Sequence, residues 1–299
     1  IEDFEYDVDI VLHEHNHQHF WRDYTKPKIA YTIWETDLMD DNFFKRLLEY
    51  DALWVPSEWQ KECVIEQGYP ADRVNVVPGA VEADCVPDPN EKPDDLIFTF
   101  CLLGRWDNRK STTEILECFV ELFGNNPNVQ LIASIDNVFA RDGLSTQERL
   151  NKFGWGNINN IILKSFLSCA RSEGWNIPLI EAMACGTPAI YSDCSAQIEF
   201  AHGKGIPIRV LGKEAAHVGP KEVASQFTSG MPGHYFTPDF EHLKKKMQHC
   251  VDNYESLKAT ALEESIELRR KYTWKNSARV ALDHLNNRYI TQTKKRMKT

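Results

Sequence analysis

Two glutamates eight residues apart, Glu173 and Glu181, flank the start of a predicted helix that follows a buried strand. Asn176 is expected to cap this helix and Pro178 to lie in its first turn. The N-terminus of a helix carries free N–H groups and the positive end of the helix dipole, so it attracts anions. A carboxylate in the first turns can also accept two hydrogen bonds from a ribose diol. This spacing predicts a site for a phosphate ester that carries a sugar.

A glycine and two cations follow another predicted strand, at residues 97–104. Gly104 would let the backbone approach a ligand closely, because glycine has no Cβ. Arg105 offers a planar fork of donors and Lys110 a compact point charge, a pair that suits a diphosphate. Ligands of open α/β sheets bind at the carboxyl ends of the strands, so both motifs are expected at one edge. Together they favour a molecule with a diphosphate between two polyols, such as a nucleotide sugar.

Each motif taken alone has a plainer interpretation. Glu181 could simply complement the helix dipole while Glu173 belongs to an exposed loop. Residues 104–111 could likewise form a solvated, charged loop. It is the combination of both motifs at one edge of one sheet that favours a ligand site.

The elements that must position these residues alternate between apolar, strand-like runs and helical patterns. This alternation predicts an α/β fold with doubly wound parallel sheets covered by helices on both faces. Ser57, Ser111 and Ser145 each precede a helical pattern with Glu or Gln three residues later, which is typical of a capping box. The chain after about residue 238 is helical in pattern. The strand-like runs are 9–13, 29–34, 52–56, 74–78, 97–104, 129–135, 160–165, 167–170 and 188–192.

A Pro-rich, polar stretch at residues 84–95 separates two candidate domains. We expect a first domain at 1–90, short for a doubly wound unit and so incomplete, a second at 91–273, and a helix with a tail at 274–299. The runs 160–165 and 167–170 meet with almost nothing between them, although parallel strands need a crossover of about a dozen residues or more. Either they form one long strand or a helix-containing segment is omitted between Phe166 and Leu167; we favour the omission.

Composition excludes several classes of protein. The chain has 299 residues, with 34 Lys and Arg against 44 Asp and Glu and a net charge of −10. Binding nucleic acid without sequence preference needs an excess of cations, which this chain lacks. No apolar run approaches the roughly 20 residues of a membrane-spanning helix. The eight cysteines form no C-x-x-C pair, which favours reduced, buried thiols. We therefore expect a cytoplasmic protein, with residues missing before Ile1.

The motifs together resemble the signature of the family 4 retaining glycosyltransferases, which have the GT-B fold. The resemblance rests on Gly104-Arg105 with Lys110, on SEGWNIPLIEAMACGTP at 172–188, and on segments at 54–59, 76–81 and 272–274. It implies two Rossmann-like domains that face a cleft, and a C-terminal helix that crosses back to the N-terminal domain. It also implies sugar transfer from a nucleotide diphosphate sugar to a hydroxyl of a glycan, a lipid-linked acceptor or a small molecule.

The resemblance assigns roles to the matching positions. Arg105 and Lys110 would hold the donor diphosphate, Glu181 would bind the ribose, and Glu173 would face the donor sugar near its reacting carbon. No metal ion or cofactor would be needed, because the cations and the helix N-terminus stabilise the leaving diphosphate. The donor-binding residues are Gly104, Arg105, Lys110, Asn176, Ile177, Pro178, Leu179 and Glu181.

Three features depart from the pattern of this family. Ser111 replaces the glycine that often follows the lysine, and it fits a helix cap. Glu35 takes the place of a cleft histidine that many members carry, and we expect it to orient the acceptor or to act as a base. The crossover between Phe166 and Leu167 is absent.

Other interpretations stay open from the sequence. The histidines between residues 13 and 19 could share one strand face and bind a metal, line the cleft, or lie on plain surface. The basic runs 244–246 and 294–298 are either solvated surface or a contact with an anionic membrane that holds a lipid-linked acceptor. A dinucleotide-dependent enzyme would need G-x-G-x-x-G after a strand, and the chain has no such run. The alternative function is a non-catalytic GT-B protein that binds a nucleotide sugar and acts as an assembly partner.

Overall fold

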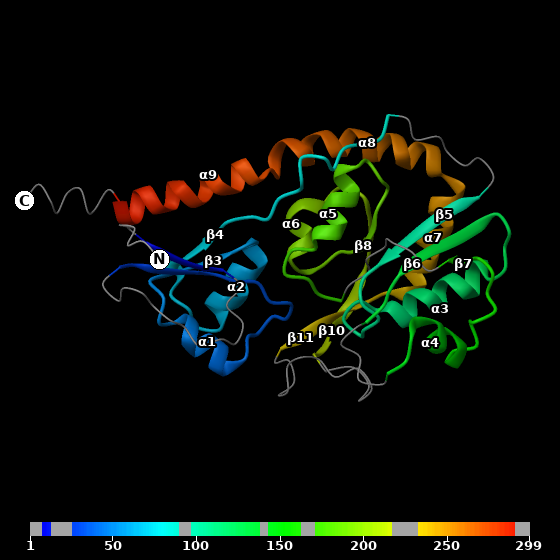
Figure 1. Cartoon of the computed structure of the whole chain (residues 1–299), viewed down its shortest axis with the longest axis horizontal. Coiled ribbons are helices and arrows are strands. Elements are labelled where there is room, and N and C mark those ends of the chain that lie inside the picture. The colour runs from blue at the N-terminus through cyan, green and yellow to red at the C-terminus, as the bar shows by residue number, and fades with distance from the viewer. Residues whose placement is uncertain are drawn as a thin grey trace, which may run out of the picture.

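The computed structural model describes residues 8–12, 26–89, 97–137, 143–162, 171–216 and 233–290. Two α/β units lie side by side beneath one long helical arm (Figure 1). The first unit is drawn in blue to cyan, the second in green to yellow, and the arm in orange and red. The predicted α/β class is confirmed.

The first unit is a parallel sheet of four strands in the order β1-β2-β3-β4. Its strands are β1 (Asp9–Leu12), β2 (Lys28–Tyr31), β3 (Ala52–Val55) and β4 (Val74–Val76). All four positions of β3 are buried, as a continuous apolar run requires of a strand covered on both faces. The helices α1 (Asp41–Leu47) and α2 (Glu58–Glu66) and a 3₁₀ turn at Ala71–Arg73 complete the unit.

The second unit contains three groups of strands. The strands β5 (Phe98–Leu103), β6 (Val129–Ser134) and β7 (Ile161–Ile162) are parallel and adjacent, and β8 (Ile190–Ser192) pairs in parallel with β9 (Ile206–Ile208). The hairpin of β10 (Val210–Ala215) and β11 (His234–Pro238) is antiparallel. The prediction missed β9, β10 and β11. The helices are α3 (Thr112–Phe123), α4 (Thr146–Lys152), α5 (Ile177–Ala184), α6 (Ile198–Ala201), which follows a 3₁₀ turn at Ser195–Gln197, and α7 (Phe240–Asp252).

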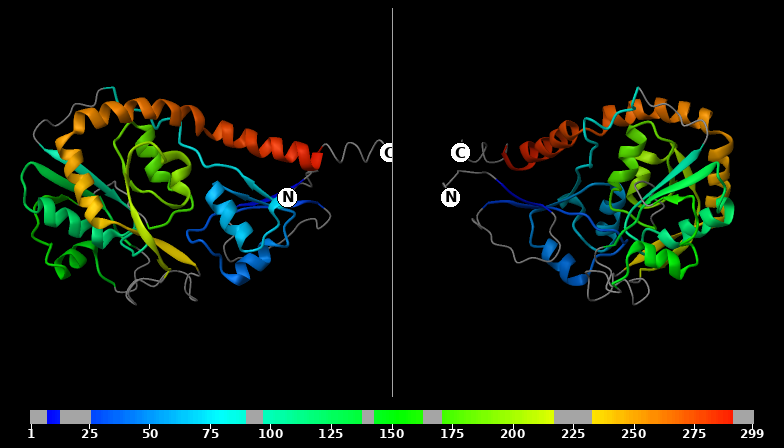
Figure 2. Two further views of the ribbon diagram at one scale, coloured as in Figure 1. Left: turned by 180° about the vertical axis from the view of Figure 1, so that it is seen from behind. Right: turned by 45° about the vertical axis from the view of Figure 1, so that its right-hand side comes forward.

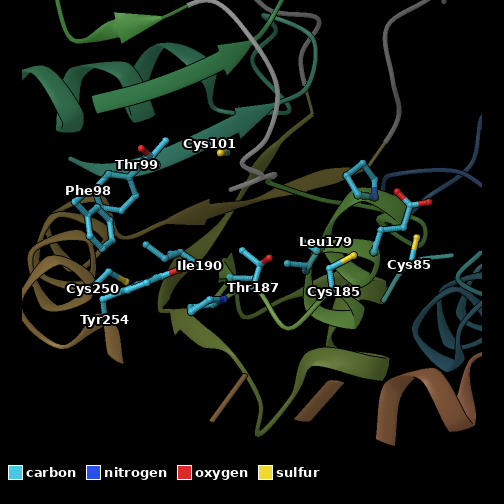
Figure 3. Close-up of a pocket in the computed structure, with 16 residues that line it drawn as sticks. Cys85, Phe98, Thr99, Cys101, Leu179, Cys185, Thr187, Ile190, Cys250 and Tyr254 are labelled. Atoms are coloured by element: carbon cyan, nitrogen blue, oxygen red, sulfur yellow. The ribbon is translucent and has the colours of Figure 1, made fainter. Parts of the chain in front are cut away.

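A cavity of about 490 Å³ lies between β5 and the segment that leads into β8 (Figure 3). A doubly wound sheet of order 3-2-1-4-5-6 places its fourth strand beside the first. Here the order is β7-β6-β5, then the cavity, then β8-β9, and no described strand pairs with β5 or β8 on the side of the cavity. Residues 163–170, which include one of the predicted strands, lie outside the described residues. The omitted crossover between Phe166 and Leu167 therefore stays a prediction.

The arm consists of α8 (Tyr254–Lys271), α9 (Trp274–Leu285) and a π-helical turn at Asn286–Ile290. It runs along the second unit and reaches the first, as both further views show (Figure 2). Backbone contacts join its bend to the linker, since Val81 N donates to Tyr272 O at 3.0 Å. The Nε1 of Trp54 in β3 donates to Nδ1 of His284 in α9 at 3.0 Å. The predicted C-terminal helix that returns to the first unit is confirmed, whereas the residue numbers given for the domain limits stay predictions.

The predicted helix caps have three different outcomes. Ser145 forms the full capping box with Glu148. Ser57 accepts a hydrogen bond from the backbone N of Gln60, but the Gln60 side chain turns to another carbonyl, so only half of that box forms. Ser111 adopts a left-handed conformation with φ of 53°, and its side chain makes no cap hydrogen bond. The prediction of a capping box at Ser111 was therefore wrong. Among the described helices, none is both long enough and apolar enough to cross a bilayer.

Candidate active site

The loop after β5 folds around one lysine. Gly104 has a φ of +147°, and a Cβ placed on it would lie 3.3 Å from Cδ of Lys110. The glycine thus makes room for the Lys110 side chain to cross the end of the strand. Asp107 fixes the loop, because its Oδ1 accepts from Lys110 N at 2.8 Å and its Oδ2 lies 3.4 Å from Nε of Arg105. Arg105 is the more exposed cation of the loop, with 42% of its side chain accessible.

Glu173 is a buried carboxylate held by two cations. Its Oε2 accepts from Nη1 of Arg109 at 2.9 Å, and its Oε1 pairs with Nζ of Lys110. The backbone N of Glu173 donates to Oγ of Ser195 at 3.0 Å. Burial acts to raise the pKa of Glu173, but Lys110 and Arg109 outweigh it and hold the pKa below its ordinary value. The carboxylate is therefore ionised.

Arg109 is the central residue of the site, and the sequence interpretation gave it no role. It is 8% exposed, and its Nη1 also donates to Ser172 O at 3.1 Å. Its Nη2 lies 3.6 Å from Oε1 of Glu35. Burial acts to lower the pKa of Arg109, but Glu173 and Glu35 raise it above its ordinary value. The available signal was the adjacent pair Arg109-Lys110, of which only the lysine matched the motif.

Glu35 comes from the other unit, four residues after the end of β2. The two units touch beside it: a Cβ on Gly174 would lie 2.3 Å from Cγ1 of Ile33 and 2.7 Å from Trp34 O. The glycine that follows Glu173 is thus required by the close approach of the two backbones. Through Arg109, the structure brings together the two predicted catalytic residues, Glu35 and Glu173.

A second contact joins the units at Asp37. Its Oδ2 pairs with Nζ of Lys213 in β10 at 2.8 Å, and its Oδ1 accepts from the backbone N of His234 in β11 at 2.7 Å. Burial acts to raise the pKa of Asp37, but Lys213 and His234 bring it below its ordinary value. The unpredicted hairpin therefore ties the second unit to the loop that carries Glu35.

The N-terminus of α5 differs from the prediction in one respect. Asn176 is the N-cap residue, but with φ of +73° it is left-handed and its side chain makes no cap hydrogen bond. Its Nδ2 donates instead to Oε1 of Gln197 at 2.6 Å. The predicted side-chain cap was therefore wrong. Pro178 lies in the first turn, as predicted, and Ile177 is half exposed.

The remaining predicted donor-binding residues of α5 include Pro178, Leu179 and Glu181. Glu181 lines the cavity of Figure 3 together with Pro178 and Leu179. Its pKa is raised, first by burial and then by the nearby carboxylates of Glu82 and Asp84. The residues predicted to bind the sugar donor thus lie in two places, the loop after β5 and the cavity beneath α5. Among the described residues, no group of three His, Cys, Asp or Glu could hold a metal ion, and the histidine run at 13–19 lies outside them.

The chain is similar in sequence to viral proteins that are named as candidate glycosyltransferases. No family model matches the chain. A protein of Sulfolobus islandicus filamentous virus named as a candidate glycosyltransferase, number 41, is 26% identical over 188 residues, which are 60% of this chain and 51% of that protein. A second candidate glycosyltransferase of the same virus, number 48, is 34% identical over 107 residues, 34% of this chain and 31% of that protein. The matches therefore span about half and about a third of the length of these two relatives.

The solved structure of Anabaena HepE in complex with UDP-glucose superposes with a TM-score of 0.65 at 12% identity, over 88% of this chain and 73% of that one. The fold is GT-B. In this GT-B chain, the loops that follow β2 and β5 meet at the boundary of the units, since Glu35 and Arg109 pair there.

Proposed function

We propose that the chain is a glycosyltransferase that moves a sugar from a nucleoside-diphosphate sugar to an acceptor hydroxyl. One observation supports this above the others: Glu173 is buried and ionised between Arg109 and Lys110, at the point where the two GT-B units meet. A carboxylate and cations at such a boundary can bind the sugar hydroxyls and the diphosphate of one donor. The names of the viral relatives support sugar transfer, and the UDP-glucose bound to HepE supports a nucleoside-diphosphate sugar as the donor.

The donor diphosphate would lie between the loop after β5 and the N-terminus of α5. Arg105 and Lys110 would neutralise its charge, with Gly104 making room for the lysine. The backbone N–H groups at 177–179 and the helix dipole would add to this stabilisation. The leaving diphosphate would then need no metal ion. Glu181, on the next turn, would bind the ribose.

Retention of the anomeric configuration would proceed by departure and attack on the same face of the sugar. A double displacement needs a free carboxylate as nucleophile, and Glu173 and Glu35 are both bound to Arg109. Glu173 would instead bind the sugar hydroxyls near the reacting carbon. Glu35, anchored by Arg109, would orient the acceptor hydroxyl or take its proton.

The acceptor would be a glycan, a lipid-linked saccharide or a small molecule that enters from the first unit. We propose a cytoplasmic location for the protein. Lys244 pairs with Glu121 and Glu241, so Lys245 and Lys246 on α7 would make the contact to an anionic membrane that carries a lipid-linked acceptor. The basic run at 294–298 lies outside the described residues.

A second candidate function is a non-catalytic, nucleotide-sugar-binding partner in an assembly. Glu35 favours it, because it takes the place of the cleft histidine that the family resemblance leads us to expect. Release or transfer of sugar by the purified chain distinguishes the two functions, since only the enzyme consumes the donor.

A thermal-shift screen tests the proposed donor. UDP, GDP, ADP and CMP would each be added with and without EDTA, alongside NAD. A ligand that binds only the folded state raises the unfolding midpoint by mass action. We expect one nucleoside diphosphate to raise the midpoint whether or not EDTA is present. A rise with NAD alone, or with none of the nucleotides, would contradict the proposal.

A further inference from the structure

We propose that Arg109 is a positioning residue, a fixed counter-ion that lets Lys110 exchange from Glu173 to the donor diphosphate. This inference rests on the proposed function and deepens it, because it divides the work between two adjacent cations. The proposed function needs Lys110 at the diphosphate, whereas the structure shows Lys110 on Glu173. One cation cannot hold both places, so Glu173 needs a second one.

Arg109 has the features of a fixed counter-ion. Its side chain is 10% exposed, and its guanidinium is held by Glu173, by the carbonyl of Ser172 and by Glu35. An arginine fork loses little freedom per hydrogen bond, because it is planar and rigid. Lys110, in contrast, carries a point charge on a flexible stem that passes over Gly104, where no Cβ restricts it. Arg109 is therefore held in place, whereas Lys110 is able to move.

The exchange of Lys110 would be costly without Arg109. A buried carboxylate with no cation takes up a proton, because burial disfavours the charged form. Glu173 is 6% exposed, so the loss of both cations would neutralise it when the donor binds. Arg109 keeps it ionised. Glu35, Arg109 and Glu173 then carry a net charge of −1 beside the sugar, where glycosyl transfer develops positive charge at the anomeric carbon.

Arg109 also sets the position of Glu35 against Glu173. The two carboxylates belong to different units, and the guanidinium touches both, at 2.9 Å from Oε2 of Glu173 and 3.6 Å from Oε1 of Glu35. The acceptor-side and donor-side carboxylates are thus held by one rigid group. Closure of the two units on a donor would carry Glu35 to the same place each time.

The first test compares Arg109→Met and Arg109→Lys with the wild type in donor turnover as a function of pH. In Arg109→Met, the acidic limb of the kcat profile is expected to move up by about one to three pH units, because Glu173 loses its permanent cation. The kcat should fall on the order of 100-fold, with KM for the donor changed by less than about threefold. Arg109→Lys should leave the limb near its wild-type position, since it keeps the charge.

Arg171→Met serves as the matched control. Arg171 is also a buried arginine with two carboxylate partners, Glu114 and Glu214, and neither belongs to the site. This variant should lose thermal stability and keep the wild-type pH profile. If the limb does not move in Arg109→Met, or moves equally in Arg171→Met, the positioning role is wrong.

A second measurement is independent of activity. Unfolding midpoints of Arg109→Met, Glu173→Gln and the double variant form a cycle. Arg109→Met alone should lower the midpoint on the order of 10 °C, because it leaves a buried charge with one partner fewer, and Glu173→Gln should recover part of this loss. If the midpoint losses of the two single variants simply add in the double variant, Arg109 does not stabilise the Glu173 carboxylate. A wild type that turns over no donor would overturn the proposed function, while the cycle would still decide this contact.

Discussion

Arg109 and Glu35 meet across the boundary of the two α/β units, with Nη2 of Arg109 3.6 Å from Oε1 of Glu35. Arg109 follows β5 of the second unit and Glu35 follows β2 of the first. The same guanidinium binds Glu173 at 2.9 Å. A separation of the units would therefore part the two carboxylates, which makes the boundary itself a component of the site.

Gly174 is expected to tolerate no side chain. A Cβ would lie 2.3 Å from Cγ1 of Ile33, so Gly174→Ala must push the units apart. We expect the unfolding midpoint to fall by about 5 °C and turnover to fall with it, because overpacking a tight contact typically costs about 1–3 kcal/mol. Gly156→Ala is the control: its Cβ would lie 1.7 Å from Oδ1 of Asn151, the end of a side chain that can turn away, whereas the nearest backbone atom, Cα of Asn151, is 3.4 Å away. Equal stability of the two variants would contradict the close contact.

The contact of Asp37 with Lys213 and His234 predicts a pH-dependent contribution to stability. The pKa of Asp37 in the folded state lies below its ordinary value of 3.8. The ionised carboxylate thus stabilises the folded state above pH 3.8, and this contribution is lost as the pH falls through the folded pKa. Asp37→Asn should cost about 1–2 kcal/mol at neutral pH.

The gap between the midpoints of wild type and Asp37→Asn should narrow as the pH falls from 6 toward 3, in thermal unfolding followed by circular dichroism. Asp72→Asn, whose carboxylate is 79% exposed, should show little difference at any pH. A gap that stays constant through this range would refute the linkage.

His284 predicts a second pH effect, at the end of the arm. Trp54 Nε1 can only donate, so Nδ1 of His284 must be unprotonated to accept at 3.0 Å. Burial, and next the charge of Arg288, lower the pKa of His284 below 6.5. The arm contact is therefore fully present above pH 6.5 and is lost as the pH falls toward the folded pKa.

Between pH 7.5 and 5.5, wild type should lose more thermal stability than His284→Gln, and the fluorescence of Trp54 should change. His202→Gln is the control, because that side chain is 77% exposed and binds no part of the arm. If His284→Gln loses as much stability as wild type over this interval, the contact does not titrate.

The two cations assigned to the diphosphate predict a loss of affinity. Arg105→Ala combined with Lys110→Ala should weaken binding of the nucleoside diphosphate about 100-fold or more, since hydrogen bonds to charged groups contribute about 1.5–3 kcal/mol each. Calorimetric titration measures this directly. Lys244→Ala, on α7 with Glu121 and Glu241 as partners, should bind as the wild type does. Unchanged affinity in the double variant would mean that the donor binds elsewhere.

The sequence predicted those elements whose signal is local and continuous. The apolar run of β3 and the alternation of strands with helices predicted the α/β class, because burial on both faces leaves a recognisable pattern. The position of Glu173 and Lys110 after strands predicted that both would lie at the same edge of the sheet. The strands β9 to β11 were missed: β9 is a three-residue strand with a proline at its centre, and β10 is largely exposed.

Side-chain direction and contacts across the units could not be read from spacing. Arg109 differs from Lys110 by one position in the chain, yet only the folded loop shows that it is the arginine that reaches both carboxylates. Ser111 and Asn176 carry the side chains of helix caps, but left-handed backbones turn them away from the helix. For Asn176, a hydrogen bond to Gln197 replaces the local cap.

The most direct test of retaining transfer is to determine, by NMR, the anomeric configuration of the sugar first released from an α-linked nucleoside-diphosphate sugar. The spectrum must be recorded before the anomers equilibrate. Wild type should release the α-anomer. Glu173→Gln should release none above background while still binding the nucleoside diphosphate with only a modest loss of affinity. Release of the β-anomer, unchanged turnover by Glu173→Gln, or no consumption of any donor would contradict the proposed retaining transfer.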